Sequence, residues 1–133
     1  MVDRDNAIAK FAEGKLGQQI SRGECTDLVD AALAYVKAKP GNNYVWGQVA
    51  TTPRRGNIIQ FWDTKFSWKD ANGGSGTWGT APGGHHTAIV KSANGTQVTL
   101  IHQNDGQRVV TTRAIDLAWS HTGTYIIYAA VRP

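Results

Sequence analysis

Apolar residues follow two different periods along the chain, and the change between them divides it into a helical part and a strand part. Early in the chain, apolar positions recur at three- and four-residue intervals, which predicts helices over residues 4–16 and 25–38. Gly17 and Pro40 stand where these helices should end. The apolar stripe of the second helix consists of Leu28, Val29, Ala32, Leu33 and Val36.

Beyond residue 56 the apolar residues occur in short runs between turn residues, which is typical of strands. Asn94-Gly95 lies between two such runs and predicts a tight hairpin. We expect loops over residues 41–53 and 69–84 and a short helix over 114–119. The predicted strands cover residues 57–62, 86–92, 96–103, 108–113 and 124–131.

This order of elements predicts an α+β fold, with N-terminal helices packed on an antiparallel sheet of about five strands. The 133 residues, of which 41% are hydrophobic and 18% charged, suit a single folded domain over 1–133. No apolar stretch is long enough to span a membrane, so we expect no membrane insertion. The net charge of +4 comes from scattered residues, with only Arg54-Arg55 adjacent, and this does not predict a nucleic-acid partner.

Cys25 is the only cysteine, which excludes an intramolecular disulfide and a cysteine-rich zinc module. It stands at the predicted start of the second helix, where the helix dipole and free N–H groups stabilise a thiolate and lower its pKa. The same N–H groups can bind the oxyanion of a tetrahedral intermediate. Cys25 also shares a helix face with Leu28 and Val29, so its position alone leaves open both a nucleophile and a core residue.

A nucleophilic thiol needs a base, and histidine is the usual one. The chain has four histidines: His85, His86, His102 and His121. His86 opens a predicted strand after a Gly-rich loop, and the Asn94-Gly95 hairpin brings His102 close to it. His102 and Asn104 share a strand face, so either one can hold the His86 imidazole in its working tautomer. His85 and His86 point to opposite strand faces and no HExxH helix exists, so we expect no metal and no cofactor.

Four segments together resemble the CHAP amidase/peptidase family within the NlpC-like papain-fold cell-wall hydrolases. The segments are GECTDLVDAAL, RRGNIIQFW, GHHTAIV and TLIHQNDG, and they extend over about residues 23–106. The resemblance implies a papain-like fold with Cys25 as nucleophile and His86 as base. Gln103 and Asn104 match the Gln-Asn of the family's third segment, whereas His102 stands where that family usually has Glu.

The resemblance further implies an amidase or endopeptidase that hydrolyses an amide of peptidoglycan peptides. Two alternatives stay open: a papain-like deamidase or transferase acting on a protein amide, and a non-enzymatic binding module. Gln19 is a candidate oxyanion donor. Trp46 and Trp78, both on predicted loops, are candidates for a substrate groove, whereas we expect Trp62 and Trp119 in the core.

The expected partner is peptidoglycan or its peptide fragments, met by a monomer in the cell wall or periplasm. Residues 1–5 lack the features of a secretory signal, so the export route is left open. If the protein is an effector delivered into a rival cell, an immunity protein is the expected second partner.

Overall fold

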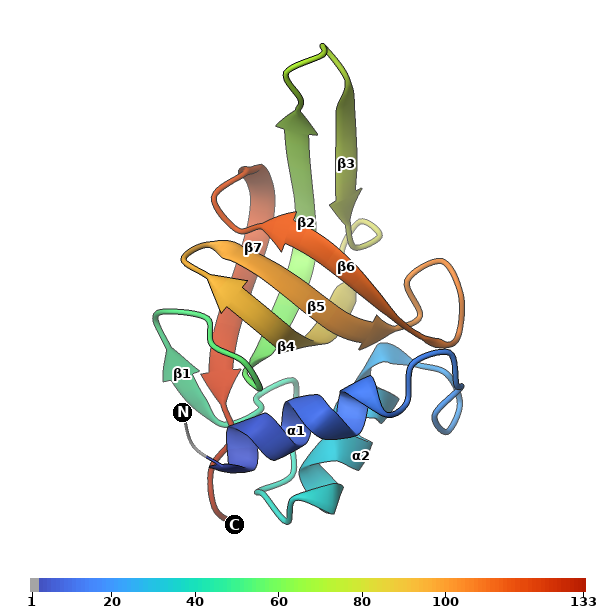
Figure 1. Ribbon diagram of the computed structural model, residues 1–133, viewed down its shortest axis with the longest axis vertical. Helices are drawn as coiled ribbons and strands as arrows, with labels where there is room; N and C mark the ends of the chain where they lie inside the picture. The colour runs from blue at the N-terminus through green and yellow to red at the C-terminus, as the bar shows by residue number, and fades with distance from the viewer. Residues whose placement is uncertain (1–2) are drawn as a thin grey trace.

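The computed structural model describes residues 3–133 and contains two helices beside one seven-stranded sheet (Figure 1). The sheet is antiparallel throughout, as predicted, but has more strands than the five expected. The helices are α1 (Asp3–Glu13) and α2 (Cys25–Tyr35). The strands are β1 (Gln48–Ala50), β2 (Ile58–Lys69), β3 (Ser75–Gly79), β4 (His85–Asn94), β5 (Gln97–Gln103), β6 (Val110–Asp116) and β7 (Ser120–Ala129).

Both predicted helices form, and α2 begins at Cys25 as the apolar period indicated. It ends earlier than predicted, because Lys37 adopts a left-handed conformation with φ of 57° that an α-helix cannot continue through. The two helices lie on one face of the sheet (Figure 1). Their buried residues, including Ile8, Leu28 and Leu33, pack there against Ile89 of β4.

The strand order is β1-β7-β2-β4-β5-β6, with β3 added beside the far end of β2. The β4–β5 hairpin turns at Asn94-Gly95 as predicted, and Asn94 pairs with Gln97 across it. Side chains alternate between the two faces of the sheet. On β4, Ile89 faces the helices, while Ala88 and Val90 belong to a second core cluster on the opposite face.

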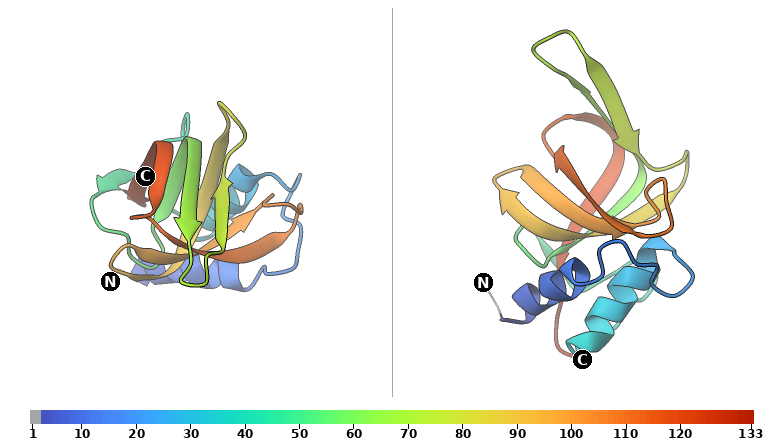
Figure 2. Two further views of the ribbon diagram at one scale, coloured as in Figure 1. Left: turned by 90° about the horizontal axis from the view of Figure 1, so that it is seen from above. Right: turned by 45° about the vertical axis from the view of Figure 1, so that its right-hand side comes forward.

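Two segments differ from their predicted structure. Residues 69–84, expected as a loop, contain β3, which pairs with an extended β2 to form a hairpin that projects from the body (Figures 1 and 2). Residues 114–119, expected as a short helix, instead continue β6 to Asp116 and turn into β7. In both segments cross-strand pairing outweighs weak local preferences. Neither described helix is long and apolar enough to cross a membrane.

Candidate active site

The N-terminus of α2 is fixed by a cluster of hydrogen bonds just before Cys25. The Asp27 carboxylate accepts the backbone N–H groups of Arg22 at 3.0 Å and Glu24 at 3.2 Å. It also accepts the Arg22 guanidinium at 3.0 Å. Burial alone would raise the pKa of Asp27, but the Arg22 guanidinium and these N–H groups hold it below its usual value. Asp27 therefore stays ionised and fixes the turn that leads into the helix.

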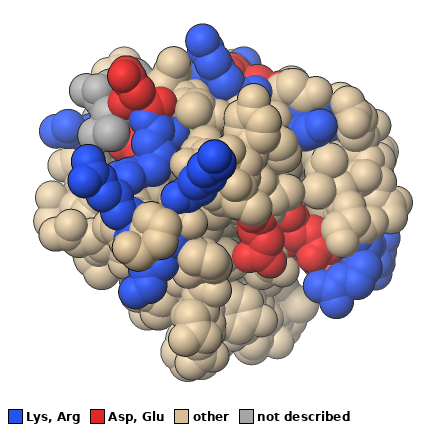
Figure 3. Space-filling view, turned by 90° about the horizontal axis from the view of Figure 1, so that it is seen from below, with Lys and Arg blue, Asp and Glu red and all other residues tan. Residues whose placement is uncertain are grey.

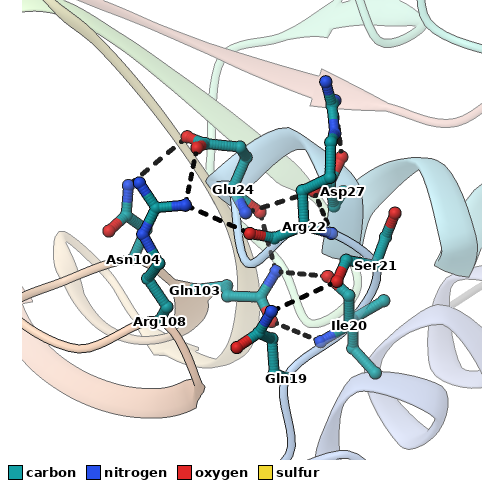
Figure 4. Close-up of polar contacts among 9 residues, drawn as sticks. All are labelled: Gln19, Ile20, Ser21, Arg22, Glu24, Asp27, Gln103, Asn104 and Arg108. Carbon is teal, nitrogen blue, oxygen red and sulfur yellow. Dashed lines mark hydrogen bonds and ion pairs between the residues drawn. The ribbon is translucent and has the colours of Figure 1, made fainter.

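Gln103, the last residue of β5, joins this turn to the sheet (Figure 4). Its amide oxygen accepts the N–H of Ile20 at 2.7 Å. Its amide nitrogen donates to the carbonyl oxygens of Ile20 at 3.1 Å and Glu24 at 2.8 Å. Because Gln103 is fully buried, these three bonds hold the residue before Cys25 at a fixed distance from β5.

The Cys25 thiol contacts the residue that directly follows His86. Its sulfur interacts with the backbone N–H and the hydroxyl group of Thr87, near the start of β4. This edge of β4 is open, because the β4–β5 ladder begins only at the Ala88–His102 pair. Within residues 3–133, no hydrogen bond joins the Cys25 sulfur to His86 directly. Thr87 and His86 are neighbours on β4, so their side chains point to opposite faces of the sheet: the Thr87 side chain lies on the helix face with the Cys25 sulfur, and the His86 ring lies on the other face against Phe61 and Trp78.

The expectation of a lowered thiol pKa is wrong for this structure. Burial raises the pKa of Cys25, and the contacts with Thr87 and the N–H of Thr26 offset this only in part. The Glu24 carboxylate also raises it. Loss of hydration therefore outweighs the favourable field of the helix N-terminus, and the resting group is a neutral thiol.

His86 and His102 meet on the sheet face opposite the helices. The Nε2 atom of His86 lies 2.8 Å from the Nδ1 atom of His102. His102 is completely buried, and His86 retains only 8% of its surface exposed. Trp78 and Phe61 pack edge-on or tilted against the His86 ring. Of the two residues that the sequence offered for orienting the His86 imidazole, His102 and Asn104, it is thus His102 that contacts it.

Asp105 extends this contact into a chain of three groups. Its Oδ2 atom lies 3.2 Å from Nε2 of His102, close enough for an ion pair, although Nε2 makes no hydrogen bond within the described residues. Asp105 also accepts the indole N–H of Trp78 at 3.0 Å and the Nε–H of Arg113 at 2.7 Å. The contact with His102 and these two donors lower the pKa of Asp105, so it is a carboxylate.

These contacts determine where the protons lie. A carboxylate only accepts, so its position 3.2 Å from Nε2 of His102 favours the tautomer with the proton on that nitrogen. In neutral His102 the Nδ1 atom is then an acceptor, and His86 must donate to it from Nε2. The Nδ1 atom of His86 is left unprotonated, as a general base requires. Asp105, acting through His102, therefore selects the basic tautomer of His86.

The surroundings also keep His86 uncharged. Burial, together with the electrostatic influence of His102, lowers the pKa of His86 to about 3. Asp105 acts in the opposite direction but does not overcome the burial. At neutral pH the site therefore contains a neutral thiol and a neutral imidazole rather than a preformed ion pair.

Two other candidate residues have different contacts from those expected. Asn104 lies beyond the end of β5 in a left-handed conformation with φ of 65°, and its exposed side chain is 3.4 Å from the Glu24 carboxylate. That conformation turns it toward the α2 side instead of continuing the strand to His86. The Gln19 side chain is exposed and donates to the carbonyl oxygen of Ser21 at 3.3 Å (Figure 4).

The tryptophans are arranged differently from the prediction. Trp46 is buried in the core beside the helices and donates to Gln60 at 2.8 Å, so it lines no groove. Trp78 lies on β3 and is mostly buried against Phe61, where it supports the histidines, and it also borders a surface pocket shared with Thr64 and Lys65. Trp62, expected in the core, is 55% exposed, and Trp119 is only half-buried. The predicted loop or strand position of each tryptophan therefore did not predict whether its side chain is buried.

Several residues of this site were not identified from the sequence. Asp105 was interpreted only as part of an Asp-Gly turn, and Thr87 only as a strand residue. Arg113 gave no signal of its own, since it belongs to a scattered set of basic residues. Within residues 3–133, no three His, Cys, Asp or Glu side chains are grouped as a metal site.

Comparison with known proteins places the whole arrangement in a family. The AIM3/BBC1 cysteine proteinase-fold domain matches residues 5–132, which is nearly the full chain. No curated protein matches the chain. Among solved structures, Ly7917 is 15% identical with a TM-score of 0.57, covering 92% of this chain and 61% of its own.

A second structure, of Ly7917 with the hydrolyzing product of MDP, is 17% identical with a TM-score of 0.59. The match covers 92% of this chain and 62% of that chain. At these identities the likeness concerns the fold, and the chain spans about three fifths of the length of Ly7917. The predicted papain-like cysteine-proteinase fold is confirmed at this level.

Proposed function

The chain belongs to the AIM3/BBC1 cysteine proteinase-fold domain family, and on this premise we propose that it is a cysteine hydrolase of amide bonds. The observation that carries the proposal is the His86–His102–Asp105 chain of contacts, which begins one strand position before the Thr87 that contacts the Cys25 sulfur. The His86 imidazole is buried, its Nδ1 atom is left free, and the next residue on the strand contacts a thiol at the start of a helix. A purely structural histidine does not need this combination.

In the first half of the reaction, the thiol lies at the open edge of β4 and the His86 ring reaches that edge from the opposite face of the sheet. Its Nδ1 takes the thiol proton as the sulfur attacks the substrate carbonyl carbon. The oxyanion that forms is stabilised by the backbone N–H of Cys25 at the start of α2. The intermediate collapses when His86 returns its proton to the leaving nitrogen. The C–N bond breaks, the amine departs and a thioester remains on Cys25.

In the second half, water replaces the amine. His86 removes a proton from the water molecule, whose oxygen attacks the thioester carbonyl carbon. Collapse of this second intermediate breaks the C–S bond and releases a carboxylic acid. The proton on His86 returns to the sulfur, which regenerates the neutral thiol. The neutral resting pair suits this cycle, because each proton transfer is coupled to bond formation.

We propose peptidoglycan as the substrate, with the amide either in the stem peptide or between the sugar lactyl group and the peptide. Two features support this class. The motif order around Cys25 and His86 resembles the CHAP cell-wall hydrolases. The structural neighbour Ly7917 was crystallised with the hydrolyzing product of MDP. The site of action that follows from this substrate is the cell wall or periplasm.

Digestion of purified peptidoglycan tests the proposal. The wild-type protein should release new free amines and shorter muropeptides, detected by amine labelling and mass spectrometry. Cys25→Ala and His86→Ala should release none, while Asn104→Ala should keep most of the activity because Asn104 does not contact His86. If the wild type and Cys25→Ala give the same products, the protein is not a hydrolase of this polymer.

A further inference from the structure

Three exposed aromatic rings form a parallel stack on the sheet face that carries the helices, at the start of β4 and beside β2. The rings of Tyr44 and His85 have centroids 4.0 Å apart, and those of Trp62 and His85 are 5.7 Å apart. The interplanar angle is 2° in both pairs. All three side chains are exposed, with 40% of Tyr44 and 55% of Trp62 accessible. We call Tyr44, His85 and Trp62 the aromatic platform.

The backbone that presents Tyr44 is in an unfavourable conformation. Asn43 and Tyr44 both have positive φ, at 55° and 64°, within a tight turn closed by the hydrogen bonds between Asn42 and Val45. Positive φ is uncommon for a bulky residue such as tyrosine and costs roughly 1 kcal/mol or more. Because the ring is 40% exposed, burial of this side chain does not explain why the turn adopts this conformation.

The platform lies on the same side of β4 as the contacts of Cys25. His85 and Thr87 are two residues apart on β4, so their side chains point to the same face, about 7 Å apart along the strand. The Thr87 hydroxyl interacts with the Cys25 sulfur. Trp62 is directly opposite His85 in the β2–β4 ladder. A substrate whose amide reaches the thiol therefore passes next to these rings.

We propose that the aromatic platform binds a pyranose ring of the substrate, an inference that rests on the proposed function. One face of a pyranose presents C–H groups that stack on flat aromatic surfaces, while its hydroxyl groups stay hydrated or bond the polar ring edges of Tyr, His and Trp. With the sugar on the platform, the amide that reaches Cys25 is one close to the sugar. The platform thus selects glycopeptides over sugar-free peptides.

A binding experiment tests the platform without hydrolysis. The Cys25→Ala protein, labelled with ¹⁵N, is titrated with the tetramer of N-acetylglucosamine, which carries no peptide. The indole signal of Trp62 should shift, and Trp62→Leu should weaken binding about tenfold or more. The matched control is Trp119→Leu, because Trp119 stacks instead on Trp68, near the tip of the β2–β3 hairpin. That variant should bind as the parent does.

A kinetic experiment separates this inference from the proposed function. For two substrates with the same amide, one bearing the sugar and one without it, Trp62→Leu should raise KM about tenfold only for the first. Unchanged saccharide binding in Trp62→Leu, or an equal loss on both substrates, overturns the platform while leaving the hydrolase intact. Saccharide binding by a protein that cleaves no peptidoglycan overturns the hydrolase and keeps the platform.

Discussion

Asp105 is the residue on which the protonation of the whole site depends, although it touches neither the thiol nor the base. Its carboxylate accepts hydrogen bonds from Trp78 and Arg113 and lies 3.2 Å from Nε2 of His102. An asparagine at this position has one oxygen and one NH2 group. Its NH2 group would therefore face a nitrogen of Trp78, Arg113 or His102 that now has a carboxylate oxygen beside it. We therefore regard Asp105 as a positioning residue for His86.

Asp105→Asn should reduce kcat about 10- to 100-fold with little change in KM. This loss is smaller than the ~10⁴-fold loss when a carboxylate bonded directly to the base is replaced, since His102 stands between. The ¹⁵N shifts of the two histidines should change from protonated Nε2 toward a tautomer mixture. Asp116→Asn, which alters a carboxylate bonded only to Thr96 and Ala118, is the control. Unchanged shifts and kcat would show that Asp105 does not set the tautomer.

Some residues of the site could be predicted from the sequence and others could not. Cys25 and His86 could be found because each stands at an element boundary that a periodic pattern defines. Asp105 could not, because an Asp before Gly is common in turns and its role depends on Trp78 and Arg113, which come from two other strands. The direction of the Cys25 pKa also depended on burial, which the helix start alone does not determine.

At the scale of elements, Gln103 ties the segment before α2 to β5, in addition to the apolar packing of α2 against the sheet. Its amide satisfies three backbone groups of the segment that precedes the helix (Figure 4). The salt bridge between Arg108 and Glu24, at 3.2 Å, lies on the exposed side of the same segment. Exposed ion pairs contribute little, so the buried amide dominates.

Gln103→Met should lower the free energy of unfolding by about 2–3 kcal/mol, because it leaves buried N–H and C=O groups of Ile20 and Glu24 unpaired. The loosened segment should also expose the thiol, so iodoacetamide should label native Cys25 faster than in the wild type. Urea unfolding and mass spectrometry measure the two effects.

The neighbouring residue supplies the control for this prediction. Asn104→Gly removes only a long, exposed contact and keeps the left-handed backbone, since glycine adopts positive φ readily. It should change stability by less than about 0.5 kcal/mol. Equal effects of the two substitutions would argue against the role of Gln103.

The elements themselves were predictable where one face is clearly apolar. The start of α2 and the Asn94-Gly95 hairpin follow from local sequence and are present as expected. The β2–β3 hairpin was missed because Ser75–Gly79 has almost no apolar alternation, and it is a strand only through its pairing with Lys65–Lys69. Whether such a segment forms a strand depends on the neighbouring strand as well as on its own residues, so the segment alone does not predict it.

At the scale of the whole molecule, charge is distributed in separate groups. On the face seen from below, most Lys and Arg side chains gather on the left, and a separate acidic spot lies right of the centre (Figure 3). A net charge of +4 arranged in this way gives little long-range attraction for one polyanion. The pH dependence of stability should therefore reflect individual buried groups more than overall charge.

His86 is the buried group that matters most between pH 6.5 and 4. In the unfolded chain a histidine takes up a proton near its ordinary pKa of about 6.5. In the folded protein burial lowers the pKa of His86 to about 3, so the folded state does not bind that proton over the same range. The unfolded state therefore gains stability as the pH falls through this window. The contribution of Asp105 changes only below the ordinary pKa of a carboxyl group.

The free energy of unfolding should consequently fall by about 1.4 kcal/mol for each pH unit below 6.5 on account of His86 alone, or roughly 2 kcal/mol by pH 5. His86→Gln keeps a polar, uncharged side chain that cannot take up this proton. Urea unfolding of both proteins at pH 7, 6 and 5 should show the wild type losing its advantage over the variant as the pH falls. Because every other titrating group is shared, the difference between the two isolates His86. A difference that stays constant from pH 7 to 5 would mean that folded His86 binds its proton as readily as the unfolded chain does.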